Sequence, residues 1–142
     1  MKLCERVIEH RLRAITRVSM NQFGFMPGRS TMDAIFLIRQ VMERYRKKKK
    51  DIHIVFIDLE KACDKIPRNV MWWALDNHKV PTKYVELIKD MYNNVVTSVR
   101  TSKRDTDDFP IRIGLHQGSA LSPYLFALMM DEVTKDIQGD IP

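Results

Sequence analysis

The sequence lacks the features that would place it in a membrane or outside the cell. No apolar run approaches the ~20 residues that a helix needs to cross a bilayer. The polar first six residues do not form a signal peptide. The chain has only two cysteines, Cys4 and Cys63, far apart and in no Cys-x-x-Cys pattern. We therefore expect reduced thiols in an intracellular protein that does not bind a membrane.

Charge is distributed unevenly along the 142 residues. Residues 1–50 hold 13 Lys and Arg against 4 Asp and Glu, a net charge of +9, whereas residues 51–142 hold 11 against 14, a net charge of −3. A basic first third suggests a surface for a polyanion, and nucleic acid is the obvious one because phosphate contacts dominate its binding energy. A solvated basic helix face is the plainer explanation, and charge does not decide between them.

The spacing of apolar residues predicts a mostly helical chain with a few strands. Helical periodicity recurs in residues 3–15, 34–45, 70–75, 84–92 and 125–133. Ser30 or Thr31 offers an N-cap for the second helix. The β-branched residues 95–101 and the segment 109–113 predict two strands joined by an exposed hairpin.

The central stretch is an apolar run that ends in a carboxylate. Residues 52–57 are almost all apolar, which suits a strand buried on both faces, and Asp58 follows directly. A buried carboxylate needs a cation, hydrogen-bond donors or access to solvent. Asp58 could therefore be a metal ligand, or it could cap the segment that follows; the spacing leaves both open.

Three stretches, in this order, resemble the reverse transcriptase domain of non-LTR, LINE-type retrotransposons. They are Gln22–Ser30 (QFGFMPGRS), Phe56–Asp64 (FIDLEKACD) and Gly114–Pro123 (GLHQGSALSP), and the similarity extends over essentially the whole chain. Plant-type members look most similar, judged by residues such as Met71–Leu75. The resemblance implies an α+β fold, a partial right-hand polymerase whose helices pack on a small antiparallel sheet. Residues 1–50 would be a basic part of the fingers, and residues 51–142 part of the palm.

The resemblance also implies a two-metal nucleotidyl transfer from dNTP to a primer 3′-hydroxyl. Asp58 matches the catalytic aspartate that binds both divalent ions, and the carbonyl of Leu59 would add a ligand to one of them. The ions would be Mg²⁺, with Mn²⁺ as a substitute. Mg²⁺ commonly uses one or two carboxylates together with phosphate oxygens and water, which a strand-end aspartate facing a cleft can supply.

Other positions would hold the substrates. Ala62 and Cys63 match the pair under the incoming deoxynucleotide, and Gln117 and Gly118 match the segment lining the nucleotide and template side of the pocket. Gly28–Arg29 belongs to the fingers region that contacts template and primer. The implied partners are an RNA template, a DNA primer, dNTP, and the rest of the palm and thumb if these are encoded elsewhere. The implied location is the nucleus or cytoplasm of a eukaryotic host.

Two departures from the family pattern bear on activity. The position of Cys63 is usually aromatic, with a ring that excludes the ribose 2′-hydroxyl, so we expect weaker sugar discrimination. A Tyr/Phe-Ala-Asp-Asp hairpin, which carries another metal-binding carboxylate, would follow the helix that ends near Ile137, and the sequence does not contain it. Asp131, Asp136 and Asp140 are poor substitutes, expected on the helix surface and in the tail. We therefore expect the chain alone to be inactive.

Two alternatives to a polymerase stay open. The chain could be a nonenzymatic nucleic-acid-binding remnant of a degenerate retrotransposon. It could also be a metal-dependent hydrolase that uses Asp58 and Glu60, because residues i and i+2 of a strand share a face and can chelate one cation.

Overall fold

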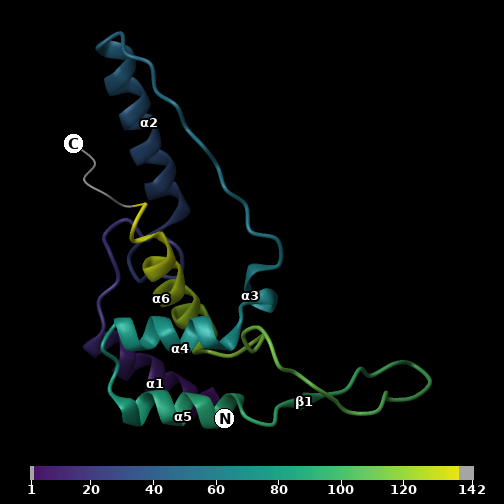
Figure 1. Cartoon of the computed structure of the whole chain (residues 1–142). Helices are drawn as coiled ribbons and strands as arrows, with labels where there is room; N and C mark the ends of the chain where they lie inside the picture. Colours follow the sequence, from purple (N-terminus) through teal and green to yellow (C-terminus); the bar gives the residue numbers. More distant parts are fainter. Residues whose placement is uncertain (1, 138–142) are drawn as a thin grey trace.

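The computed structural model describes residues 2–137, which form six helices and one short pair of strands. The helices and strands are α1 (Lys2–Ile15), α2 (Thr31–Lys47), α3 (Ala62–Lys65), α4 (Arg68–Asn77), α5 (Thr82–Tyr92), β1 (Val96–Thr97), β2 (Phe109–Pro110) and α6 (Ser122–Thr134). In Figure 1, α1, α4 and α5 lie together at one end of the molecule, with α6 beside them and α2 at the other end.

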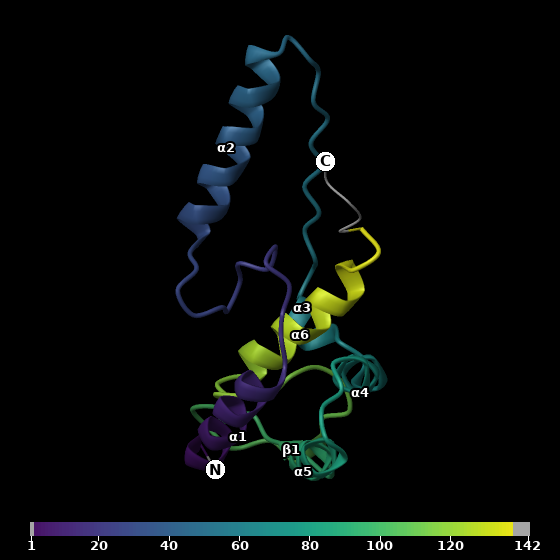
Figure 2. The ribbon, with the colours of Figure 1, turned by 90° about the vertical axis from the view of Figure 1, so that its left-hand side faces the viewer.

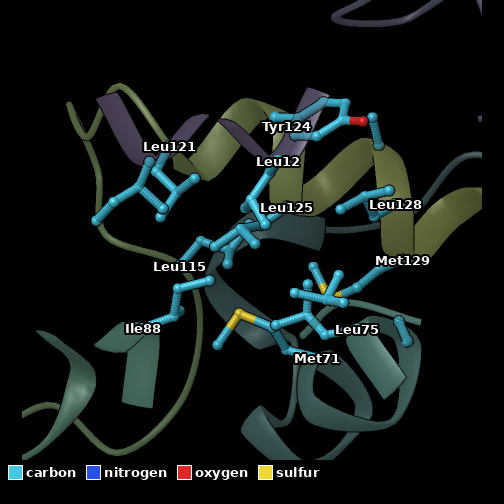
Figure 3. Packing of buried hydrophobic residues seen from close by; sticks show 14 of the residues in the cluster. Leu12, Met71, Leu75, Ile88, Leu115, Leu121, Tyr124, Leu125, Leu128 and Met129 are labelled. Carbon is cyan, nitrogen blue, oxygen red and sulfur yellow. The ribbon is translucent and has the colours of Figure 1, made fainter. Parts of the chain in front are cut away.

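The hydrophobic core lies where α1, α4, α5 and α6 meet. Figure 3 shows side chains from these helices and from the loop before α6 packed together. The largest fully buried side chains are Tyr92, Tyr124, Leu12, Met71, Leu75, Ile88, Leu121, Leu125 and Leu128. Helix α4 packs directly against α6. These helices are stabilised mainly by their shared apolar face, because helices of this length are marginal in isolation.

Local signals explain where the helices begin. The Ser30 hydroxyl accepts a hydrogen bond from the Asp33 amide, and the Asp33 carboxylate accepts one from the Ser30 amide, which makes a capping box at α2. Pro67 and Pro81 directly precede α4 and α5, and Pro123 lies in the first turn of α6, where a missing amide proton costs nothing.

The segment after α1 is tied to α6. The hydroxyls of Thr16 and Tyr124 share a buried hydrogen bond of 2.6 Å. The Ser19 amide donates to Asp131 Oδ1 at 3.0 Å, and the Arg13 guanidinium lies 4.1 Å from the centre of the Tyr124 ring. These contacts fix the start of the loop that leads to α2.

Residues 31–60, which we name the arm, project away from the core. The arm consists of α2 and the extended chain that returns from it, and Figures 1 and 2 show α2 and most of the returning chain standing clear of the other helices. Helix α2 buries no residue, although Ile35, Ile38, Val41 and Met42 recur along one face. The helical periodicity of this segment was predicted correctly, but its apolar face lacks a partner within residues 2–137.

The predicted strand over residues 52–57 is wrong for this structure. The segment is extended but not assigned to any strand, and Val55, Phe56 and Ile57 are 81%, 80% and 75% exposed. Strands are stabilised by hydrogen bonds to a neighbouring strand. Within the described residues, the backbone of this segment has no such neighbour.

The predicted fold class holds only in part. The structure is mostly helical, and its sheet is one antiparallel pair, with Val96 opposite Pro110 and Thr97 opposite Phe109. An isolated bridge joins Arg100 to Asp105 farther along the hairpin. The strands lie where they were predicted but are much shorter. The helices pack on one another rather than on a sheet, because so small a sheet offers almost no apolar surface.

Truncation of the core should destabilise the chain strongly. Leu128→Ala leaves a cavity between α6 and α4, and we expect a loss of about 2–5 kcal/mol in the free energy of unfolding. Val133→Ala on the same helix is the control, because that side chain is exposed and its truncation should change little. Urea unfolding followed by circular dichroism measures both variants. Equal losses would contradict the assignment of the core.

The arm should make the isolated chain self-associate. Its exposed extended segment and apolar helix face are both features that promote association. We expect Phe56→Asp to shift the chain toward monomer in sedimentation velocity. Leu3→Asp, at an exposed position of α1 outside the arm, should not do so. A monomeric wild-type chain with one cooperative melting transition would contradict this expectation.

Candidate functional site

A cavity of about 530 Å³ lies between the base of the arm and the loop that precedes α6. Its walls come from three separate parts of the chain: the loop before α2, the segment around α3, and the segment that leads into α6. The lining residues are Phe25, Leu59, Lys61, Ala62, Cys63, Asp64, Leu115, His116, Gln117, Gly118, Ser119, Ser122 and Pro123.

Two backbone hydrogen bonds join the two main walls. The amide of Gly114 donates to the carbonyl of Ile66 at 2.9 Å, and the amide of Leu115 donates to the carbonyl of Cys63 at 2.8 Å. Gly114 has a φ of +80°, and a Cβ atom there would lie 2.5 Å from the carbonyl oxygen of Asp64. Only glycine fits so close a backbone approach. We name this contact between residues 63–66 and 114–115 the backbone clasp.

A side-chain hydrogen bond continues the clasp at the mouth of the cavity. Gln117 Nε2 donates to Asp64 Oδ1 at 2.8 Å, and this bond fixes the direction of the carboxamide. Gly118, the next residue, has a φ of +74°, and nothing lies within 4 Å of the position that a Cβ would occupy. The backbone at Gly118 therefore stands open to a ligand.

Behind the loop that precedes α6, the side chains of Tyr92, His116 and Arg68 pack together. The rings of Tyr92 and His116 are stacked with centroids 4.0 Å apart, and the Arg68 guanidinium donates to the carbonyls of Tyr92 and Ile111 at 2.6 and 2.5 Å. Burial, and then the nearby Arg68 charge, lowers the pKa of His116. Burial raises the pKa of Tyr92, because it disfavours the charged form of the phenol just as it disfavours the charged imidazole. Both side chains are therefore neutral near pH 7.

The opposite end of the loop is bound by a buried carboxylate. Glu5 of α1 is 4% exposed, and its Oε2 atom accepts hydrogen bonds from Ser119 Oγ and the Ala120 amide, each at 2.9 Å. The sequence interpretation missed this residue. A signal was present, since Glu5, Ile8 and Leu12 follow helical spacing and share one face of α1.

The structure brings the four predicted nucleotide-site residues together. Ala62 and Cys63 face the cavity from one wall, and Gln117 and Gly118 face it from the other. Leu59 also lines it, whereas Asp58 lines a neighbouring groove of about 310 Å³ between the base of the arm and α6. Leu59 and Ala62 border both hollows, so the two are adjacent.

The predicted fingers residues lie elsewhere. The Arg29 guanidinium lies 5.1 Å from the centre of the Phe23 ring and donates to the carbonyl of Met20, so it folds back on its own loop. Neither Arg29 nor Gly28 lines the cavity. Phe25 does, and its ring makes an edge-on contact with Phe126 of α6 at 6.0 Å between centroids.

The carboxylates near the arm differ in their availability to a cation. Glu60 forms an ion pair with Lys65 at 3.1 Å, whereas Asp58 is exposed and has no hydrogen bond or ion pair to any residue in 2–137. No group of three or more His, Cys, Asp and Glu side chains within those residues could hold a metal ion. A single free carboxylate beside an open groove suits a cation that takes its other ligands from phosphate and water. Of the Asp58–Glu60 pair considered for a hydrolase, Glu60 is engaged by Lys65 in this structure, and the chelating role of the pair stays a prediction.

Of the acidic residues of α6 and the segment after it, one differs from the expectation. Asp131 is buried and accepts the Ser19 amide, so its expected place on the helix surface is wrong. Asp136 is exposed, and Asp140 lies outside the described residues.

Among residues 2–137, no helix is long and apolar enough to cross a bilayer.

Comparison with known proteins places this chain in a family. A family model for reverse transcriptase (RNA-dependent DNA polymerase) matches residues 1–141. The retrovirus-related Pol polyprotein of the type-2 retrotransposable element R2DM, from Drosophila melanogaster, is 24% identical over 135 residues, which are 95% of this chain and 13% of that protein. The probable RNA-directed DNA polymerase of transposon BS, from the same organism, is 27% identical over 131 residues, 89% of this chain and 14% of that protein.

A vertebrate relative extends the pattern. The uncharacterized 149 kDa protein of transposon TX1, from Xenopus laevis, is 25% identical over 132 residues, 92% of this chain and 10% of that protein. The chain thus spans only 10–14% of the length of these three relatives. It belongs to the reverse transcriptase (RNA-dependent DNA polymerase) family and is related to retrotransposon polymerases of the non-LTR class.

Proposed function

We propose that this chain supplies the nucleotide-binding part of an RNA-directed DNA polymerase, from a plant-type LINE-like element, in which dNTP is added to a primer 3′-hydroxyl on an RNA template. One observation carries the proposal: Ala62, Cys63, Gln117 and Gly118, matched to the nucleotide pocket by resemblance alone, line one cavity. The division into a fingers part over residues 1–50 and a palm part over residues 51–142 stays a prediction.

Each wall of the cavity has a role in this proposal. Ala62 and Cys63 would lie under the sugar and base of the nucleotide. The open backbone at Gly118 and the oriented carboxamide of Gln117 would line the opposite side. Phosphoryl transfer needs mainly positioning and charge stabilisation, and a clasped loop provides positioning.

Asp58 would serve the reaction from the neighbouring groove. Its carboxylate, free of protein partners within residues 2–137, would hold Mg²⁺ together with the carbonyl of Leu59 and the phosphates of the nucleotide. When bound, such ions activate the primer hydroxyl and stabilise the leaving pyrophosphate. Asp58 directly precedes Leu59, which lines both the cavity and the groove. A triphosphate that extended from the cavity into the groove would therefore come near the Asp58 carboxylate.

Nonenzymatic nucleic-acid binding is the second candidate, and the end of the arm favours it. Arg44, Arg46 and Lys47–Lys50 are all exposed there. Such a cluster suits phosphate contacts whose strength falls with salt. Binding of an RNA–DNA template–primer tests this candidate. It is favoured if Lys47–Lys50→Gln weakens that binding, Gln117→Ala leaves it unchanged, and the chain binds no dNTP.

Binding of a fluorescent dGTP analogue with Mg²⁺ tests the proposed pocket. We expect Gln117→Ala to weaken binding about tenfold, because it removes a polar contact and the bond to Asp64. Asp58→Ala should remove the dependence on Mg²⁺. Gln40→Ala and Asp51→Ala are matched controls at exposed positions of the arm. Equal affinity in all these variants would exclude the cavity as the nucleotide site.

Primer extension tests activity directly. With Mg²⁺ or Mn²⁺, we expect the 142-residue chain to extend a primer no better than its Asp58→Ala variant. The reason is that the resemblance assigns another metal-binding carboxylate to a hairpin that the sequence lacks. Extension clearly above the variant would contradict this expectation and would assign polymerase activity to the chain itself.

Cys63 should determine how well the pocket distinguishes sugars. Its small side chain lines the cavity and leaves room beside a ribose 2′-hydroxyl. We expect wild-type protein to bind GTP and dGTP analogues with similar affinity, and Cys63→Phe to favour dGTP about tenfold, since a ring on the cavity wall would clash with the extra hydroxyl. Cys4→Phe, at the other exposed cysteine, is the control. An unchanged ratio in Cys63→Phe would contradict this role.

A further inference from the structure

A buried carboxylate on α1 holds the loop that forms one wall of the cavity. Glu5 Oε2 accepts two hydrogen bonds of 2.9 Å, one from Ser119 Oγ and one from the Ala120 amide. Ser119 Oγ in turn accepts a bond from the Leu121 amide at 3.2 Å. Glu5 therefore binds three consecutive loop residues, directly or through one hydroxyl, across a large separation in sequence.

The position of this carboxylate is otherwise unfavourable. Glu5 shares its helix face with Ile8 and Leu12, both in the core, and it is 4% exposed. Burying a carboxylate costs several kcal/mol unless donors satisfy it. Helix α6 begins at Ser122 without a side-chain cap from its N-cap residue, Leu121, and its dipole favours a negative charge there. The amides of Ala120 and Leu121, just ahead of the helix, donate instead to Glu5 and to Ser119 Oγ. Glu5 and the start of α6 satisfy each other.

The loop is consequently anchored at both ends, and between the two anchors His116 stacks on Tyr92 and Gln117 bonds to Asp64. At one end is the backbone clasp, in which Gly114 and Leu115 bond to residues 63–66. At the other end is Glu5. Gln117 and Gly118 lie between these two anchors and face the cavity. Without Glu5, Ser119 and Ala120 would lose their contact with α1, and this end of the loop could move relative to Ala62 and Cys63.

We propose that Glu5 is a positioning residue for the nucleotide site: through Ser119 and Ala120 it holds residues 117–118 at their distance from residues 62–64. The identity of the ligand rests on the function proposed above, but the anchoring of the loop does not. Glu5 touches neither the cavity nor a reacting atom, since it is absent from the cavity lining.

Hydrogen exchange of the full chain, resolved to single amides, tests the anchoring without any ligand. The informative probe is the amide of Leu115, which bonds to Cys63 and not to Glu5. We expect its exchange to become about tenfold faster in both Glu5→Gln and Ser119→Ala, because a weakened anchor lets the clasp open more often. Amides in the middle of α4 report global unfolding and should not change.

A second charge on the same helix provides the control. Glu9→Gln removes a carboxylate one turn along α1 that pairs with Arg13 at 2.7 Å and has no bond to the loop. It should leave Leu115 unchanged. Unchanged exchange at Leu115 in Glu5→Gln and Ser119→Ala would overturn the proposal. So would equal acceleration in Glu9→Gln, or equal acceleration at α4, which would mean a general loss of stability.

Nucleotide affinity then separates positioning from folding. In the dGTP-analogue titration, we expect Glu5→Gln to raise the Kd about tenfold at an unchanged melting temperature, and Glu5→Ala to raise it further, because glutamine keeps one acceptor oxygen. An unchanged Kd in a variant whose loop exchanges faster would overturn the positioning role. If the wild-type chain binds no nucleotide while Leu115 responds as expected, the proposed function fails and the anchoring stands.

Discussion

The backbone clasp is the contact on which the candidate site depends. Gly114 approaches the carbonyl of Asp64 so closely that a Cβ would lie 2.5 Å from it, and two hydrogen bonds of 2.8 and 2.9 Å hold the approach. It joins the base of the arm to the loop before α6, and so creates the cavity between segments that are far apart in sequence. Without it, Cys63 and Gln117 would belong to unrelated surfaces.

The charged groups around the clasp fall into two classes. Those with restricted access to solvent have protein partners: Glu5 accepts two hydrogen bonds, and the Arg68 guanidinium donates to two carbonyls. The exposed carboxylate of Asp58 has no partner within residues 2–137. Paired charges hold a structure in place, whereas an unpaired carboxylate on an open groove is available to a cation. This contrast separates the groups that shape the site from the one that would act in it.

Much of the secondary structure followed from short-range signals. The five longer helices, the Ser30 cap and the turn between two strands were predicted correctly, because spacing and caps act within a few residues, whereas the one-turn helix α3 was not predicted. The burial of individual residues was harder to predict. The apolar residues Leu3 and Val7 of α1 are exposed, while Glu5 is buried, because the core meets the face that carries Ile8 and Leu12. Hydrophobicity alone could not indicate this rotation of the helix.

By itself, the sequence determined the five longer helices, the family and the group of residues that share the cavity. Only the tertiary structure decided that residues 52–57 are exposed, that Asp131 is buried and that Glu5 anchors the loop. The physical reason is the same in each case. A strand needs a neighbouring strand, and a buried carboxylate needs donors; for Glu5 and Asp131 the donors come from parts of the chain more than a hundred residues away.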